Sequence, residues 1–202
     1  MIDASRYSVD SFILNFYDGG YLKVMLDQEK LGPYNGPLFL NTTYIDSLLP
    51  GIAAHFGKDQ AVHIDLATRE SPLSYMKPGQ IGLDVSPEIT VRVNGQVACI
   101  LDLISAQTVI AASLNNFTFI VLVVSFFING YQVVDSKFGP IDLESKRRFI
   151  NFLTYITLPV VNKLLVNGFK IPNEFFGMIR IQDAIFESKD GYVSIGVVPQ
   201  FI

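Results

Sequence analysis

Charge is absent from a long central part of this 202-residue sequence, because Leu103 to Val134 contain no Asp, Glu, Lys or Arg. Within this stretch Phe117 to Ile128 read FTFIVLVVSFFI, whereas a strand with one wet face would alternate apolar and polar side chains. The apolar run is shorter than the roughly 20 residues that a helix needs to cross a bilayer, and Phe, Val and Ile favour strands. We therefore predict a sheet that is apolar on both faces, as expected around bound lipid or in a deeply buried strand.

Charged residues and cysteine are also scarce, and this limits the functions that the sequence can have. Charged residues make up 17% of the chain, and its net charge of -4 and pI near 5.1 argue against a nucleic-acid-binding surface, which needs clustered Lys and Arg. The acidic balance also argues against electrostatic capture of anionic membranes by the chain as a whole, and it predicts a lipid affinity that depends weakly on salt. Cys99 is the only cysteine, so no internal disulfide can form.

The start of the chain shows no basic and apolar leader, because Met1-Ile2-Asp3 runs directly into foldable sequence. We expect either a cytosolic protein or a domain excised from a longer protein whose leader lies upstream. With 50% apolar residues and a mean hydropathy of +0.35, residues 1–202 fit one large domain.

Periodicity and turn signals predict an α+β roll, in which two helices pack against a long-stranded antiparallel sheet. Apolar residues at helical spacing predict a first helix between Asn41 and Phe56, in which Pro50 leaves open a start just before it. They also predict a second, long helix over Asp142 to Val166 with a kink at Pro159. The segment before Asp18-Gly19-Gly20 is predicted to be helical or extended. Strands are predicted over residues 21–26, 61–66, 83–93, 96–103, 106–114, 117–128, 131–134, 178–186 and 192–198. Asn94-Gly95 and Asp190-Gly191 are hairpin turn signals, and Asn129-Gly130 indicates a turn or bulge.

Three segments carry a resemblance to a known family. These are Leu48-Leu49-Pro50-Gly51-Ile52-Ala53-Ala54-His55-Phe56, Phe138-Gly139-Pro140-Ile141, and Leu158-Pro159-Val160-Val161-Asn162-Lys163-Leu164-Leu165 followed by Gly168-Phe169-Lys170-Ile171-Pro172. With the order of elements, they resemble the carboxy-terminal barrel of the bactericidal permeability-increasing and lipopolysaccharide-binding protein family (BPI/LBP/CETP, or TULIP). The match runs from about Ser5 to Phe201.

The resemblance implies an elongated barrel of highly twisted sheet with two helices, around an apolar tunnel for phospholipid acyl chains. It implies a lipid-binding or lipid-transfer module that is secreted or lies within a secretory compartment in the full-length protein. Family members have two barrels, with a disulfide in the first, and the cationic surface of the endotoxin-binding members lies chiefly on that first barrel. Because this sequence covers only the second barrel, its expected partners are phospholipid, a membrane surface, a first barrel or a second copy.

Residues that line such a tunnel must be apolar and must converge. Our candidates lie in both predicted helices and in the sheet: Leu49, Ile52, Phe56, Val85, Ile89, Val91, Ile120, Leu122, Val124, Phe152, Ile156 and Val160. The same residues would also form an ordinary packed core, and the sequence leaves both interpretations open.

The predicted strand over residues 117–128 allows one further prediction. If Ile120, Leu122, Val124 and Phe126 face inward, strand alternation sends Phe119, Val121, Val123 and Phe127 outward. There they would dock a partner barrel or second copy in an alternative, lipid-free function.

The polar residues form no catalytic or metal-ligating constellation, so we predict no enzymatic activity, no cofactor and no metal. His55 and His63 are expected to be exposed, and Asp142 and Glu144 are explained as acids at a helix N-terminus. Asn41-Thr42-Thr43 and Asn116-Phe117-Thr118 match the glycosylation sequon, which matters only in a secreted protein.

Overall fold

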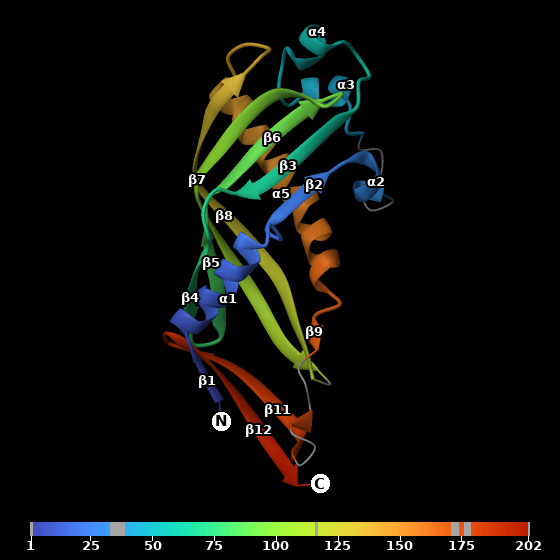
Figure 1. Cartoon of the computed structure of the whole chain (residues 1–202). Coiled ribbons are helices and arrows are strands. Elements are labelled where there is room, and N and C mark those ends of the chain that lie inside the picture. The colour runs from blue at the N-terminus through green and yellow to red at the C-terminus, as the bar shows by residue number, and fades with distance from the viewer. Residues whose placement is uncertain (1, 33–38, 116, 171–173, 176–178, 202) are drawn as a thin grey trace.

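The fold is an elongated, twisted assembly of antiparallel sheet with one long helix along it (Figure 1). A computed structural model describes residues 2–32, 39–115, 117–170, 174–175 and 179–201. In these residues the helices are α1 Arg6–Asp18, α2 Gln28–Leu31, α3 Thr42–Asp46, α4 Ile52–Phe56 and α5 Leu143–Leu165. The strands are β1 Ile2–Ser5, β2 Lys23–Leu26, β3 Val62–Thr68, β4 Leu73–Lys77, β5 Gln80–Val85, β6 Pro87–Val93, β7 Gln96–Asn115, β8 Thr118–Ser136, β9 Phe169–Lys170, β10 Glu174–Phe175, β11 Ile179–Lys189 and β12 Tyr192–Phe201.

The described strands form two open antiparallel sheets. The larger has eight strands in the order β2-β3-β6-β7-β5-β4, with β8 paired to β7 and β9 paired to β8. The smaller has four strands in the order β1-β12-β11-β10, and Figure 1 places it at one end of the molecule, next to both termini. The predicted α+β roll is confirmed, although the order of the described strands leaves the larger sheet open.

The hairpin of β7 and β8 consists of the two longest strands of the larger sheet. Four one-residue register shifts interrupt it, leaving an extra residue at Ile104 of β7 and at Val124, Asn129 and Val134 of β8. Such bulges bend a strand and increase its twist. The bulge predicted at Asn129-Gly130 is therefore confirmed, while the uncharged stretch forms two continuous strands that are longer than we predicted.

The two hairpin turns that the sequence predicts, at Asn94-Gly95 and Asp190-Gly191, contain residues with left-handed backbone conformation. Asn94 and Gly95, with φ of 49° and 82°, connect β6 to β7, and Gly191, with φ of 76°, lies in the β11–β12 turn. Residues 83–93, predicted as one strand, instead form the end of β5 and all of β6. Ser86 separates them, and each pairs with a different half of β7.

The predicted helix between Asn41 and Phe56 is wrong as a single helix, because it is divided at Pro50-Gly51. Gly51 has φ of 98°, and the Asp46 carboxylate accepts hydrogen bonds from the Gly51 and Ala53 N–H groups, so α4 starts anew after α3. The second long helix is α1, in the segment for which the sequence left helical and extended conformations open.

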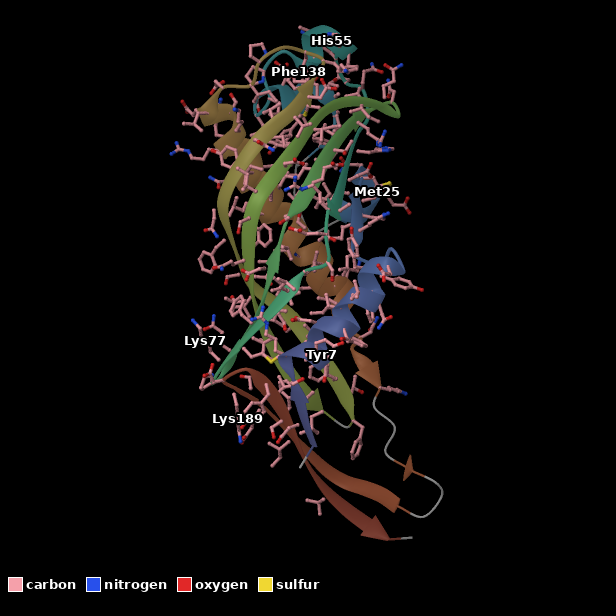
Figure 2. All side chains as sticks on the ribbon, turned by 60° about the vertical axis from the view of Figure 1, so that its left-hand side comes forward. Tyr7, Met25, His55, Lys77, Phe138 and Lys189 are labelled. Carbon is pink, nitrogen blue, oxygen red and sulfur yellow. The ribbon has the colours of Figure 1, made fainter. Side chains whose placement is uncertain are left out.

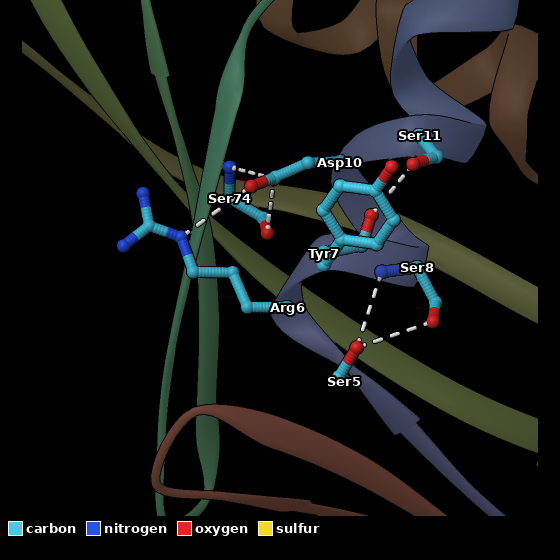
Figure 3. A network of polar contacts seen from close by, with 7 residues as sticks. All are labelled: Ser5, Arg6, Tyr7, Ser8, Asp10, Ser11 and Ser74. Atoms are coloured by element: carbon cyan, nitrogen blue, oxygen red, sulfur yellow. Dashed lines mark hydrogen bonds and ion pairs between the residues drawn. The ribbon is translucent and has the colours of Figure 1, made fainter.

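Helix α1 is tied to β4 by polar contacts (Figure 3). The Asp10 carboxylate accepts from both the N–H and the hydroxyl of Ser74, at 2.7 and 2.6 Å, and pairs with Arg6 at 3.4 Å. The Ser5 hydroxyl caps the helix by accepting from the Ser8 N–H at 3.3 Å. No side chain of α1 is fully buried, so these bonds, rather than core packing, fix its position.

Helix α5 and the half of the sheet around α3 and α4 enclose the hydrophobic core. Phe149, Ile150, Leu153 and Ile156 of α5 are buried there against β3, β6 and β7. Figure 2 shows His55 and Phe138 at this end, far from Lys77 and Lys189.

Asp142 caps the start of α5. Its carboxylate accepts hydrogen bonds from the Ser145 N–H and hydroxyl at 2.9 and 2.6 Å, and these bonds lower the pKa of the Asp142 carboxyl. Pro159 lies inside α5, where it cannot donate the helical hydrogen bond.

Candidate lipid-binding site

An apolar groove with a volume of about 320 Å³ runs beside the carboxy-terminal half of α5. We call it the α5 groove. The described residues that line it come from α2, β8, α5 and the residue after α5: Lys30, Leu31, Leu122, Pro159, Val160, Asn162, Lys163 and Val166. Such a volume lies at the lower end of the roughly 300–1,000 Å³ typical of ligand pockets.

The wall between α5 and β8 is fixed by Asn162. Its Oδ1 accepts from the Val123 N–H at 2.7 Å, and its Nδ2 donates to the Val123 carbonyl at 2.9 Å. The amide therefore pairs with the edge of β8 as a neighbouring strand would. Below it, Gly168 has φ of 60°, and a Cβ there would lie 2.6 Å from the Phe119 carbonyl oxygen, so only glycine permits this approach.

The wall formed by α2 is held in two ways. The Asp27 carboxylate caps this short helix through the Lys30 N–H at 2.8 Å, and the Leu31 side chain is buried in the core. The Lys30 Nζ donates to the Met25 carbonyl at 3.0 Å. These contacts place one lysine and one leucine at the edge of the groove.

Two of the predicted tunnel residues, Leu122 and Val160, meet in the α5 groove. Five others, Leu49, Ile52, Ile89, Val91 and Ile156, lie in the solvent-inaccessible core, and Phe56, Phe152 and Val160 pack against it. Val85 and Ile120 are half-buried. Val124 is 57% exposed and does not line either described cavity, so the structure does not bring it together with Leu122 and Val160.

Exposure alternates along β8 from Leu122 through Val124, and the bulge at Val124 shifts this alternation by one residue in the part of the strand that follows. Phe126 packs against the core and Phe127 is 58% exposed, as predicted. On the other side of the bulge Val121 and Val123 are half-buried, while Leu122 is 38% exposed. The exposed apolar residues of β8 are thus different from the outward set that we predicted.

Lys30, Leu31, Pro159, Lys163 and Val166 were not among the candidate residues. The last three follow one flank of α5 at positions i, i+4 and i+7, a spacing visible in the sequence. The approach of α2 to α5 is a long-range contact that no local pattern indicates.

A second cavity of about 580 Å³ lies where the two sheets meet, and we call it the junction cavity. It is bordered by the β4–β5 turn, the middle of β7 and the end of β11. Small residues, Gly79, Ala111 and Ala112, line one side, and Phe186 and the Lys189–Glu187 ion pair line the other. Phe186 also contacts Phe119 edge-on, with ring centroids 5.0 Å apart.

Polar side chains elsewhere have structural roles. His55 and His63 are exposed, and Asp142 is a helix cap, as predicted. The Asn41 side chain caps α3 through the Tyr44 N–H, and the other sequon asparagine, Asn116, lies outside the described residues. The described residues contain no group of three metal-ligating side chains. Within the same part of the chain, no helix combines the length and apolarity needed to span a bilayer.

Comparison with known proteins places this geometry in a family. The sequence matches the model of the LBP/BPI/CETP family, C-terminal domain, over residues 1–200. The chain belongs to this family of lipid-binding proteins. The crystal structure of lipopolysaccharide binding protein superposes with a TM-score of 0.57 at 19% identity, covering 91% of this chain and 41% of that one. The LBP/BPI/CETP-type fold is therefore shared, although this chain spans less than half of that structure. No curated protein matches the sequence.

Proposed function

We propose that the chain binds lipid acyl chains in the α5 groove, as a lipid-binding or lipid-transfer module. The observation that carries this proposal is the meeting of Leu122 and Val160 in an apolar groove, in a member of a lipid-binding family. Each methylene removed from water contributes about 0.8 kcal/mol, so an acyl chain needs few hydrogen bonds to be held. The buried candidates of the core would line an extension of this site only if lipid opened it.

The biological setting is part of the same proposal. The ligand is a phospholipid or a related lipid, and the full-length protein is secreted or resident in a secretory compartment. The domain, residues 1–202, acts beside a first barrel, because the matched family domain is the carboxy-terminal one. The chain contributes lipid binding rather than catalysis.

A matched pair of substitutions in β8 tests the site. Leu122→Asn places a polar amide in the groove, while Val124→Asn makes a similar change at an exposed position outside it. Because an unpaired amide in an apolar contact costs about 1–3 kcal/mol, we expect Leu122→Asn to weaken binding of a fluorescent phospholipid about tenfold. Val124→Asn should leave binding unchanged, and equal losses in both variants would contradict the groove.

A second candidate function is a lipid-free interaction domain. It is favoured by the outer β8 residues Val124, Phe127 and Val134, which are each more than half exposed. These residues would dock a first barrel or a second copy. Native mass spectrometry separates the two functions, because co-purified lipid supports the first and a bare mass under gentle conditions supports the second.

A further inference from the structure

We propose that the outer side of β8 and the exposed flank of α5 dock on a zwitterionic phospholipid bilayer, with the α5 groove opening toward the membrane. The proposal rests on the proposed function and names the surface through which lipid reaches the groove. We call this surface the β8–α5 face and define it by five exposed side chains: Leu122, Val124, Phe127, Tyr155 and Val166.

The part of the face on β8 begins at the groove. Leu122 lines the groove and is 38% exposed. Val124 lies two residues further along, so strand geometry places it on the same side of the sheet. After the one-residue shift at the bulge, Phe127 is the next exposed position. These three apolar side chains therefore form one row that leads away from the groove.

The part of the face on α5 borders the same groove. Pro159 and Val166 line it, and Val166 is 53% exposed. Tyr155 lies four residues before Pro159, on the same flank of the helix, and is 65% exposed. The groove thus opens between two exposed apolar rows, so a lipid leaving a bilayer docked there would enter it directly.

The charge of the face fits a zwitterionic bilayer. No charged residue occurs from Leu103 to Val134, so the β8 row is uncharged along its whole length. Among the described residues that line the groove only two are basic, whereas surfaces that bind anionic lipid carry clusters of about four to eight. Phe and Tyr side chains are favoured in the interfacial region of a membrane.

A protein partner fits the face less well. Five side chains exposed to this extent offer roughly a few hundred Å² of apolar surface, below the ~800 Å² that each partner buries in a standard interface. The Asn162 amide already occupies the backbone edge of β8 at Val123, so no other chain can pair with the strand there. A protein on this face would also cover the groove.

A single introduced tryptophan tests docking, because the chain contains none of its own. Phe127→Trp places the probe on the β8–α5 face, and Tyr7→Trp places it at an exposed position of α1. Each variant is mixed with palmitoyl-oleoyl phosphatidylcholine vesicles, with and without a brominated phosphatidylcholine. We expect a blue shift and quenching by bromine for Phe127→Trp alone. Unchanged emission from Phe127→Trp, or equal quenching of both variants, overturns the proposal.

A matched pair of double variants tests the contribution of the face. Phe127→Ser/Tyr155→Ser removes one Phe and one Tyr from the face, and Tyr7→Ser/Phe12→Ser removes the same residue types from exposed positions of α1. Because docking takes these rings out of water, we expect the first variant to bind the same vesicles at least about tenfold more weakly in flotation, and the second less than twofold. Equal losses overturn the proposal.

Two further measurements exclude other causes. Adding 20 mol% phosphatidylserine to the vesicles should change the affinity of the unmodified chain less than about threefold, and a larger increase would assign binding to basic residues and overturn the proposal. Sedimentation of the chain without lipid should give the same mass for the unmodified chain and for Phe127→Ser/Tyr155→Ser. A dimer that the variant converts to a monomer would place a second copy on the face and overturn the proposal too.

Binding in solution distinguishes this proposal from the proposed function. Phe127 and Tyr155 do not line the groove, so their double variant should keep its affinity for monomeric oleoyl lysophosphatidylcholine within about twofold. If the unmodified chain docks on vesicles but binds no lipid in solution, the proposed function fails while the docking face stands. If the chain binds lipid in solution and the face variant floats as well as the unmodified chain, the docking face alone is overturned.

Discussion

The side-chain amide of Asn162 in α5 and the backbone of Val123 in β8 are joined by two hydrogen bonds, of 2.7 and 2.9 Å. They use an N–H and a carbonyl on the edge of β8 that faces away from β7. Because a strand edge with unpaired groups otherwise recruits another chain or water, one side chain both covers the edge and fixes the wall of the α5 groove.

Replacing Asn162 with Asp should destabilise the fold by about 1–3 kcal/mol, because the donor to the Val123 carbonyl is lost and a charge takes its place. Urea unfolding measures the change. Asn151→Asp, the same change on an exposed position of α5, should cost much less. Equal losses of stability in the two variants would show that the pair of hydrogen bonds from Asn162 to β8 contributes little.

Replacing Gly168 with Ala should destabilise more than replacing Gly20. Both have positive φ, of 60° and 72°, so both substitutions strain the backbone by about 1–2 kcal/mol. Only at Gly168 would the new Cβ also meet a backbone oxygen, that of Phe119 at 2.6 Å, whereas nothing lies within 4 Å at Gly20. Thermal unfolding of the two variants compares them, and an equal fall in Tm would mean that α5 can move away from β8 at no cost.

The Cys99 thiol should be inert in the folded protein. Burial, aided by the charge of Asp135, raises its pKa to about 12. Because the thiolate is the reactive form, we expect reaction with a thiol reagent at pH 8 to be roughly a thousandfold slower than in the urea-unfolded chain. A folded protein that reacts within tenfold of the unfolded rate would place Cys99 outside the core.

The cap at Asp142 should show a characteristic pH dependence. Its carboxyl has a lowered pKa in the folded state, so its contribution to stability is present above the unfolded pKa of 3.8 and is lost as the pH falls through the folded value. Asp142→Ala should therefore lower Tm at neutral pH and lower it less in acid. Asp142→Asn keeps a capping oxygen that does not titrate, so its difference from Asp142→Ala should stay constant with pH.

Elements with strong local signals were predictable. The Asn94-Gly95 hairpin and the helix beginning at Asp142 follow from turn chemistry and capping, which need no distant partner. The helix between Asn41 and Phe56 was not, because its apolar spacing continues through Pro50-Gly51 while the backbone does not. The β8 bulges depend on pairing with β7, so simple alternation could not predict that the exposed positions shift by one residue after Val124.

The candidate site was predictable only in part. Leu122 and Val160 came from apolar patterning, which cannot distinguish a groove from a core, and most of the other candidates lie in the packed core. Lys30 and Leu31 were missed because α2 reaches α5 through tertiary packing. The weak salt dependence predicted from the net charge of -4 stays a prediction.

Photo-crosslinking tests the central claim, lipid in the α5 groove, most directly. The purified chain is incubated with a fatty acid that carries a diazirine in mid-chain, irradiated and mapped by peptide mass spectrometry. We predict adducts on residues of the groove, at Leu31, Leu122, Val160 and Val166, that excess oleate removes. Adducts confined to Val124 and Phe127 or to the junction cavity, or adducts that oleate does not displace, would contradict the account.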